Sequence, residues 1–269
     1  MSIEQIIILA VVQGISEFLP ISSSGHLILV PEFMGWADQG LVTDVMVHMG
    51  SFAAVVVYFR NDIWLLIKGG LNLLRGNVTL YGKLAIYIVV ATIPAVIFGL
   101  YVKKTGLIDS VRGAQIVGWN AIIFGILMYV ADRFSTAKKV MEDMNISPAF
   151  MIGIAQAIAI IPGTSRSGIT MTAARALGFS RPEAARFSFL LGIPAIAGAG
   201  VLVLGDVVSK GETISSDALI TGGLTFFTAL AAIAFLMKLL KSVTFLPFVI
   251  YRLILGVVLL SLVYTGAIS

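Results

Sequence analysis

The chain has 269 residues, of which 58% are hydrophobic and 12% are charged. Soluble domains carry about 25% charged residues, so the composition excludes an ordinary soluble monomer. Four stretches contain no Asp, Glu, Lys, Arg or His and have 19 or 20 residues each: 84–102, 113–131, 187–205 and 218–237. Because about 20 apolar helical residues cross the hydrocarbon core of a bilayer, the sequence predicts a polytopic membrane protein.

The basic balance of the chain does not indicate a nucleic-acid partner. The formal net charge is +4, but the cations lie in short loops between apolar stretches, without a basic run. This distribution is typical of the charge bias that orients membrane proteins, so membrane lipids are the expected surroundings. The chain has no cysteine, which excludes disulfides, thiolate metal sites and cysteine nucleophiles. These features leave the oligomeric state open.

Two weaker apolar stretches, 42–59 and 248–265, include a few charged residues and bring the number of predicted spans to six. Two further apolar segments, 3–31 and 149–177, are interrupted midway by proline, glycine and hydroxyl residues. Proline and glycine in such positions end or bend a helix. These two segments are therefore not expected to be simple spans.

The two interrupted segments resemble each other. With an offset of 143, Gln13 falls on Gln156, and a Ser-Gly pair falls on a second Ser-Gly pair. The order and near-constant spacing of such matches favour an internal duplication within a single membrane domain, 1–269. The predicted repeats are approximately 1–131 and 149–265, each with one interrupted segment followed by three spans.

The placement of lysine and arginine tests whether the interrupted segments cross the membrane. If both cross, the short loops carry eight cations on one side and nine on the other, which is no bias. If both are re-entrant hairpins, twelve cations share one side and four lie on the other. The twelve lie in the loops 60–83, 132–148, 175–186 and 238–247. Because cytoplasmic loops are enriched in Lys and Arg, the sequence favours re-entrant hairpins and a cytoplasmic location for these loops.

Three crossings then separate equivalent points of the two halves, so the predicted repeats are inverted. The first hairpin enters from outside, the second enters from the cytoplasm, and their tips meet near the midplane. Non-helical backbone at that depth is tolerated only where protein or a wet cavity satisfies its polar groups. The predicted fold is an all-α integral membrane protein with six transmembrane helices and two re-entrant helical hairpins, and its site is expected where the tips meet.

The first interrupted segment reads Q-G-I-S-E-F-L-P-I-S-S-S-G-H from Gln13 to His26. Gln13 and Glu17 are four residues apart and share one face of a helix. If the chain turns helical after Pro20, Ser23 and His26 come within reach of each other, as a nucleophile and its base require. The alternative is a polar hairpin tip whose hydroxyls cap backbone groups.

The second interrupted segment reads P-G-T-S-R-S-G-I-T from Pro162 to Thr170. Its Pro-Gly pair ends one helix, and the hydroxyls supply donors where the next helix begins. A helix N-terminus presents free N–H groups to an anion, and Arg166 adds a planar donor fork suited to phosphate oxygens. The alternative is an internal salt bridge between Arg166 and Glu17 without a ligand, and the two interpretations are compatible.

Three other polar residues lie within predicted spans. Asp44 and His48 have a spacing that suits a metal site, but interior hydrogen bonding is the favoured interpretation. Arg252 lies near the cytoplasmic end of its span and is expected to extend to the interface.

The two segments together resemble the undecaprenyl-diphosphate phosphatase family, the bacterial bacitracin-resistance proteins. The family has an E/Q-x-x-x-E pair leading into P-x-S-S-x-G-H, which Gln13, Glu17 and residues 20–26 match. A later P-G-x-S-R-S-x-x-T matches residues 162–170, and the late P-F-V-I-Y-R stretch fits as well. The resemblance thus covers the whole chain. Gln13 stands where many relatives have a carboxylate.

The resemblance implies an enzyme of the bacterial cytoplasmic membrane that removes the terminal phosphate of undecaprenyl diphosphate. The product is the monophosphate carrier lipid used in cell-wall synthesis. The resemblance also implies a divalent cation, Mg²⁺ or Ca²⁺, and a site that opens toward the outer, or periplasmic, face.

The residues and the resemblance combine into one hypothesis for the site. Arg166 and the surrounding groups hold the diphosphate, and a metal near Glu17, with Gln13 as second ligand, neutralises the remaining charge. Ser23 attacks the terminal phosphorus with His26 as base; alternatively, His26 or Glu17 activates water and Ser23 only binds phosphate. The expected phosphate-binding residues are Ser22, Ser24, Gly163, Thr164, Ser165, Ser167 and Thr170.

Two other functions compete with this hypothesis. A secondary transporter or lipid flippase would share the inverted repeats and the interrupted segments that meet at the midplane. The gathering of Ser, His, Glu and Arg at one point argues against it, since a lipid passage does not need such chemistry. An intramembrane serine protease would use Ser23 and His26 as a dyad, but it leaves Arg166 without a role.

Overall fold

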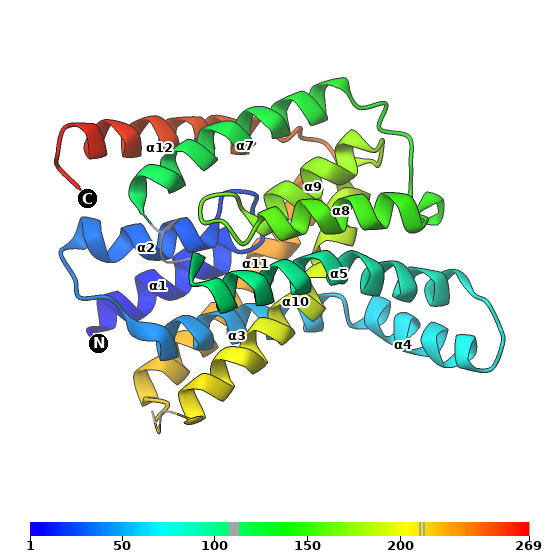
Figure 1. Cartoon of the computed structure of the whole chain (residues 1–269), viewed down its shortest axis with the longest axis horizontal. Coiled ribbons are helices and arrows are strands. Elements are labelled where there is room, and N and C mark those ends of the chain that lie inside the picture. The colour runs from blue at the N-terminus through cyan, green and yellow to red at the C-terminus, as the bar shows by residue number, and fades with distance from the viewer. Residues whose placement is uncertain (108–112, 210, 212, 269) are drawn as a thin grey trace.

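The computed structural model describes residues 1–107, 113–209, 211 and 213–268, and this part of the chain is all-helical (Figure 1). It contains eleven α-helices and one short 3₁₀ helix, η1. The α-helices are α1 (Ile3–Ser16), α2 (Ser23–Met34), α3 (Gly40–Tyr58), α4 (Arg60–Leu74), α5 (Leu80–Thr105), α7 (Ala114–Phe134), α8 (Ile146–Ile158), α9 (Arg166–Ala176), α10 (Arg181–Ser209), α11 (Ser216–Leu239) and α12 (Leu246–Tyr264). The 3₁₀ helix η1 covers Met141–Asp143.

Six of these helices are long and apolar enough to cross a membrane, namely α3, α5, α7, α10, α11 and α12. The six predicted spans are therefore confirmed as helices, including the two weaker ones. The observed helices extend beyond the uncharged stretches; α10, for example, has 29 residues. Charged residues are compatible with a helix, so the helices continue past the ends of the uncharged stretches.

The two interrupted segments each form a pair of short helices joined by a turn, α1 with α2 and α8 with α9. Figure 1 shows that each pair folds back on itself, with the two turns in the middle of the molecule and the open ends pointing in opposite directions. In both turns the residue before the second helix has a left-handed backbone, with φ of 77° at Ser22 and 71° at Ser165. These serines are 143 residues apart, which is the offset that aligns the two segments in sequence. The shared geometry supports the predicted duplication and inverted arrangement, which remain predictions.

Each helix pair packs on a span of the other half of the chain. The first helix of one pair, α1, lies against α11, and α8 lies against α5. Glycines allow these close approaches: a Cβ at Gly153 would meet the backbone of Ala91, and one at Gly14 would meet Thr228 and Ala229. The two turns are thus held inside the bundle from both halves.

Helix α4 was not predicted, because residues 60–83 were interpreted as a loop. It has one polar face, and its other face exposes Trp64, Ile67 and Leu71. A search for uncharged stretches misses a helix of this amphipathic kind. Figure 1 places the α4–α5 connection and the α7–α8 connection at the end of the molecule opposite the two termini. Of the four cations predicted for the other side, Arg112 and Lys210 lie outside the described residues.

A buried carboxylate fixes the arrangement of helices at that end. Asp132, near the end of α7, accepts hydrogen bonds through Oδ1 from Nε of Arg175 at 2.9 Å and Nε of Arg181 at 2.8 Å. Its Oδ2 accepts the backbone N–H of Phe245 at 3.0 Å. One side chain thereby joins α7 to the end of α9, the start of α10 and the start of α12.

Replacing this carboxylate is expected to destabilise the fold strongly. Asp132→Ala leaves Arg175, which is 1% exposed, without its counter-ion, and breaking a buried pair in this way costs about 3–5 kcal/mol. Denaturant titration of purified protein in detergent measures the free energy of unfolding. The matched control is Asp206→Ala, which removes the exposed partner of Lys103 and should cost no more than about 1 kcal/mol. Equal losses in the two variants would contradict the role of Asp132.

Candidate functional site

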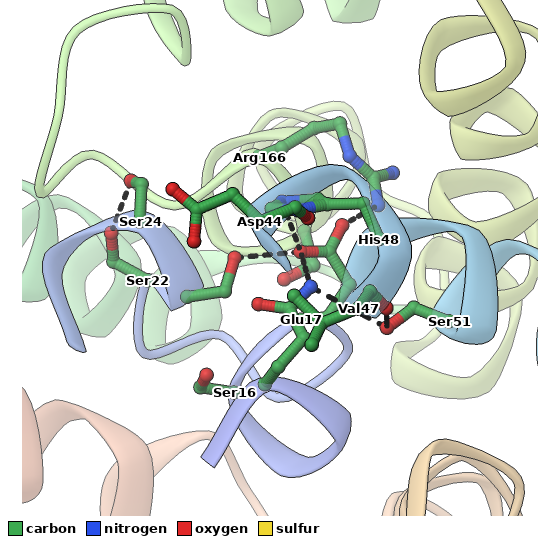
Figure 2. A network of polar contacts seen from close by, with 12 residues as sticks. Ser16, Glu17, Ser22, Ser24, Asp44, Val47, His48, Ser51 and Arg166 are labelled. Atoms are coloured by element: carbon green, nitrogen blue, oxygen red, sulfur yellow. Dashed lines mark hydrogen bonds and ion pairs between the residues drawn. The ribbon is translucent and has the colours of Figure 1, made fainter. Parts of the chain in front are cut away.

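The two turns meet at an ion pair between Glu17 and Arg166. Glu17 follows the last residue of α1, and Arg166 is the first residue of α9. Nη2 of Arg166 donates to Oε1 of Glu17 at 2.9 Å, as Figure 2 shows at the centre of the polar network. The next residue, Phe18, anchors the first turn by packing edge-on against Phe189 of α10, with ring centroids 5.3 Å apart. The expected proximity of Glu17 and Arg166 is present.

The second oxygen of Glu17 receives two further side-chain donors. Oγ of Ser23 donates to Oε2 at 2.6 Å, and Nε2 of Gln13 donates to the same atom at 3.2 Å. The carboxylate is only 7% exposed, so these donors replace the water that an exposed carboxylate would bind. The Ser23 hydroxyl therefore lies beside a strong proton acceptor.

His48 is a site residue that the sequence analysis did not assign. Its Nε2 lies 3.8 Å from Oε2 of Glu17, and Figure 2 shows the imidazole beside the carboxylate. Its Nδ1 is 2.7 Å from the Asp44 carbonyl, and since a carbonyl only accepts, Nδ1 carries the proton. The expected hydrogen bonding of the Asp44 and His48 pair thus involves the backbone carbonyl of residue 44, while the Asp44 carboxylate accepts from Gln39 at 2.7 Å. Nε2 of His48 is directed toward Glu17. The sequence signal was a histidine within an apolar span, which is costly without a task.

These groups line a cavity of about 380 Å³. Its polar lining combines hydroxyls, carboxylates, an imidazole and a guanidinium, and the remainder is apolar. The polar lining residues are Glu17, Ser22, Ser23, Ser24, Asp44, His48, Ser165 and Arg166. The structure thus brings the predicted residues Ser22, Ser24 and Ser165 into one cavity with Glu17, Ser23 and Arg166.

Four predicted phosphate-binding residues lie behind the cavity instead of lining it. Thr164 is fully buried, and Gly163 packs against the backbone of Val117. Ser167 donates to the carbonyl of Leu19 at 3.2 Å, and Thr170 lies 2.6 Å from the Ser188 hydroxyl. The prediction placed all hydroxyls around Arg166 in contact with the ligand. Successive residues of a helix point in different directions, so the Ser167 and Thr170 hydroxyls point away from the cavity and connect α9 to neighbouring segments.

The predicted pairing of Ser23 with His26 is not formed. Nδ1 of His26 donates to the Ser22 carbonyl at 2.7 Å, and Nε2 lies 2.5 Å from the hydroxyl of Tyr251 on α12. Residues three apart share a helix face, but here Ser23 is the first residue of α2 and points back into the turn. The imidazole is directed toward α12, and Glu17 occupies the place beside Ser23 that was expected for the base.

The expectation that Arg252 extends to the interface is wrong. The residue is fully buried and its guanidinium donates to five backbone carbonyls at 3.0–3.3 Å. The acceptors are Pro20 in the first turn, Gly163 and Thr164 in the second turn, and Asn120 and Ala121 on α7. Asn120 and Ala121 lie inside α7, whereas the three turn residues lie outside the helices. The carbonyls of the turns have no helical partners, and the planar fork of arginine satisfies them here.

Arg166 is held against α10 at Gly192. A Cβ built on Gly192 would overlap Nη1 of the guanidinium, so no larger residue fits without moving the cation. Within the described part of the chain Nη1 is buried and has no hydrogen-bond partner. An unsatisfied buried cationic donor is costly. Gly192 thus leaves room for the guanidinium but supplies no acceptor for this donor.

The residues of the cavity fit a divalent cation that binds together with phosphate. Among the described residues, no group of three or more His, Cys, Asp or Glu side chains is placed to hold a metal alone. Glu17 and Asp44 both line the cavity, and Mg²⁺ is usually bound by one or two carboxylates plus phosphate oxygens. Gln13, the predicted second ligand, is fully buried behind Glu17 and does not line the cavity.

The fold and the site define a class: a multi-pass membrane protein with a buried serine, carboxylate and arginine centre built from two broken helical segments. The family model described as "Bacitracin resistance protein BacA" matches residues 6–258. The chain therefore belongs to this family, and the resemblance found in its motifs is confirmed.

Relatives of similar length carry one functional name. An undecaprenyl-diphosphatase of Jannaschia sp. (strain CCS1) is 47% identical over 98% of this chain and 100% of its own length. Those of Erythrobacter litoralis (strain HTCC2594) and Maricaulis maris (strain MCS10) are 48% and 47% identical, each over 97% of this chain. The two matched regions cover 99% and 98% of the lengths of those two relatives.

The hydrogen bonds of Arg252 predict a large difference between two substitutions. Arg252→Ala removes the donor from three turn carbonyls, those of Pro20, Gly163 and Thr164, and should lower the free energy of unfolding by at least about 3 kcal/mol. Arg252→Lys keeps the charge but lacks the fork, so it should recover only part of that loss. Denaturant titration in detergent measures both, with the exposed Arg133→Ala as control. A Lys variant as stable as the unsubstituted protein would refute the need for the planar fork.

Proposed function

We propose that this chain is an undecaprenyl-diphosphate phosphatase that regenerates the monophosphate carrier lipid for cell-wall synthesis. The observation that carries the proposal is the cavity in which Arg166 and Ser23 each donate a hydrogen bond to Glu17. It combines an anion-binding group, a proton acceptor and a hydroxyl nucleophile, the three elements that hydrolysis of a phosphoanhydride requires. The names of the relatives support the same substrate.

Binding of the diphosphate rests on positive charge directed into the cavity. Arg166 lines the cavity, and its guanidinium is a planar donor fork suited to phosphate oxygens. Two helices, α2 and α9, begin at the cavity with Ser23 and Arg166, so the positive ends of both dipoles face the anion. The hydroxyls of Ser22, Ser24 and Ser165 provide further hydrogen bonds. The transferring group is thus stabilised by preorganised donors.

The chemical step follows from the hydrogen bond between Ser23 and Glu17. Oγ of Ser23 attacks the terminal phosphorus and its proton passes to Oε2 of Glu17, 2.6 Å away. The new O–P bond forms as the bond to the bridging oxygen breaks, and prenyl phosphate leaves. The proton on Glu17 passes to the departing prenyl phosphate, so the carboxylate can then take a proton from water. This water attacks the phosphorus of the phosphoserine, the proton passes from Glu17 to Oγ of Ser23, and inorganic phosphate is released. In the alternative without a covalent step, Glu17 activates water directly.

A divalent cation, Mg²⁺ or Ca²⁺, would be held by Glu17 and Asp44 together with the phosphate oxygens. Such an ion neutralises charge on the diphosphate and acts as a Lewis acid. The imidazole of His48 also lines the cavity and lies 3.8 Å from Glu17.

The proposed location is the bacterial cytoplasmic membrane, with the first hairpin and the cavity open to the outer face. The twelve cations grouped on one side support this orientation. Because the chain has no cysteine, single cysteines report accessibility cleanly. In spheroplasts, an impermeant maleimide should label a cysteine at Ser24 without lysis and one at Arg133 only after lysis. The reverse pattern would overturn the orientation while leaving the fold intact.

Loss of either member of the central ion pair should abolish most of the activity. Glu17→Ala and Arg166→Ala are each expected to lower kcat/KM for undecaprenyl diphosphate at least about 100-fold, or about 2.7 kcal/mol of transition-state stabilisation. Phosphate release by purified, detergent-solubilised protein provides the measurement, and it requires no second compartment, so a transporter would score negative.

The exposed pair of Lys103 and Asp206 supplies the control for this experiment. Lys103→Ala removes an exposed cation that does not line the cavity and should leave kcat/KM within about twofold, a change below half a kcal/mol. Near-normal turnover by folded Glu17→Ala or Arg166→Ala protein would remove that residue from the proposed mechanism. An unsubstituted protein that releases no phosphate would refute the function itself.

The covalent and direct mechanisms differ in whether Ser23 becomes phosphorylated. Rapid acid quenching of the enzyme with diphosphate labelled in the terminal phosphate should trap a phosphopeptide that contains Ser23. Ser24→Ala should retain the label and Ser23→Ala should lose it together with turnover. Full turnover without label at any quench time would favour direct attack by water.

A further inference from the structure

A second, larger cavity lies beside the site. It has a volume of about 680 Å³ and lies between α5, the end of α8 and α10. Its lining is almost entirely apolar; the polar residues among it are Thr92, Gln156 and Arg166. A hollow of this composition does not suit the charged headgroup, but it suits a hydrocarbon chain.

This apolar cavity adjoins the polar one. Four residues line both: Ala159, Arg166, Ala195 and Ala199. Arg166, which binds Glu17, therefore lies at the junction of the two cavities. Hydroxyl groups line the cavity on one side of it, and apolar side chains line the cavity on the other. A molecule bound at Arg166 through an anionic group has its uncharged part directed to this junction.

The hollow continues along α5 toward the lipid-facing surface. A third cavity of about 270 Å³ shares Thr92, Val96 and Pro194 with the second one. The lining residues on α5 run from Leu100 to Ile88, which corresponds to about 18 Å at the rise of an α-helix. We call these two connected hollows the α5–α10 groove.

Small residues keep the α5–α10 groove open. On α10 its wall is formed by Ala195, Ala197, Gly198 and Ala199, and on α5 it includes Gly99. No heavy atom of the described residues lies within 4 Å of a Cβ built on Gly198. Around the groove, large apolar side chains are exposed, among them Val96, Leu100 and Val201. Because α5 and α10 are apolar enough to span a membrane, this opening faces the lipid.

We propose that the α5–α10 groove binds the isoprene units of the substrate that are nearest to its diphosphate. The inference rests on the proposed function and deepens it by assigning a place to the prenyl chain. The prenyl chain is the expected occupant because it is covalently attached to the diphosphate that Arg166 binds. The groove is the apolar space that begins at Arg166. The substrate then enters sideways from the bilayer, between α5 and α10, with its headgroup leading.

Filling the groove should impair long substrates selectively. Gly198→Phe places a ring in the hollow from α10, and Gly99→Leu fills it from α5, where a Cβ has only an ordinary contact with Ile160. Each variant is expected to lower kcat/KM for undecaprenyl diphosphate at least about tenfold. For dimethylallyl diphosphate, which has a single isoprene unit, the change should stay within about threefold. The matched control is Gly223→Phe on α11, where an added Cβ also meets no described atom within 4 Å.

The pair of substrates distinguishes prenyl binding in the groove from damage to the headgroup site. Equal losses on both substrates would show that the substitutions damage the headgroup site, and unchanged activity on both would show that the groove holds only bulk lipid. Either result overturns the proposal. If both groove variants fail to fold, photolabelling of the unsubstituted protein decides the question.

Photolabelling tests the groove without relying on turnover. The probe is a prenyl diphosphate that carries a diazirine on its second isoprene unit. Labelled peptides should come from α5 and α10, and labelling should fall at least about fivefold in Gly198→Phe or with excess undecaprenyl diphosphate. Labels confined to other helices would overturn the proposal. A protein that releases no phosphate yet labels in the groove would refute the proposed function and retain the binding site.

Discussion

The structure depends on how two chain reversals are stabilised inside an apolar bundle. Each reversal leaves carbonyl groups without helical partners, and in hydrocarbon such groups are costly. The guanidinium of Arg252 donates to carbonyls of both turns and to α7. A single side chain from α12 thus satisfies the backbone of both turns where they meet. The polar centre exists because this backbone is held in position.

Once the turns are fixed, the charges of the site follow from their positions. Glu17 follows the last residue of α1, and Arg166 is the first residue of α9. Their opposite charges therefore lie close together and form an ion pair at 2.9 Å. Ser23 and His48 then lie beside the remaining oxygen of the carboxylate. Burial strengthens these interactions because little water competes for them. The chemistry and the fold therefore share the same few polar contacts.

Much of this architecture could be predicted from residue patterns. The lengths of uncharged stretches indicated the six long helices, and two charges of opposite sign within interrupted segments indicated the pairing of Glu17 with Arg166. The role of Arg252 could not be predicted, since its acceptors are backbone carbonyls that become neighbours only in the tertiary structure. The spacing also predicted the wrong side-chain partner for Ser23, namely His26 instead of Glu17. The rotation of α2 relative to its turn decides which side chain faces Glu17. Helix α4 could not be predicted in this way, because it is amphipathic and its sequence contains charged residues.

The position of Arg252 in the sequence has a consequence for biogenesis. A chain emerging from the ribosome makes both turns well before α12, the final helix of these 269 residues. Until α12 inserts, the carbonyls of the two reversals lack the guanidinium that organises them, although Glu17 and Arg166 are already present. The hydrogen bonds that hold the two turns together are therefore complete only when the C-terminal segment docks.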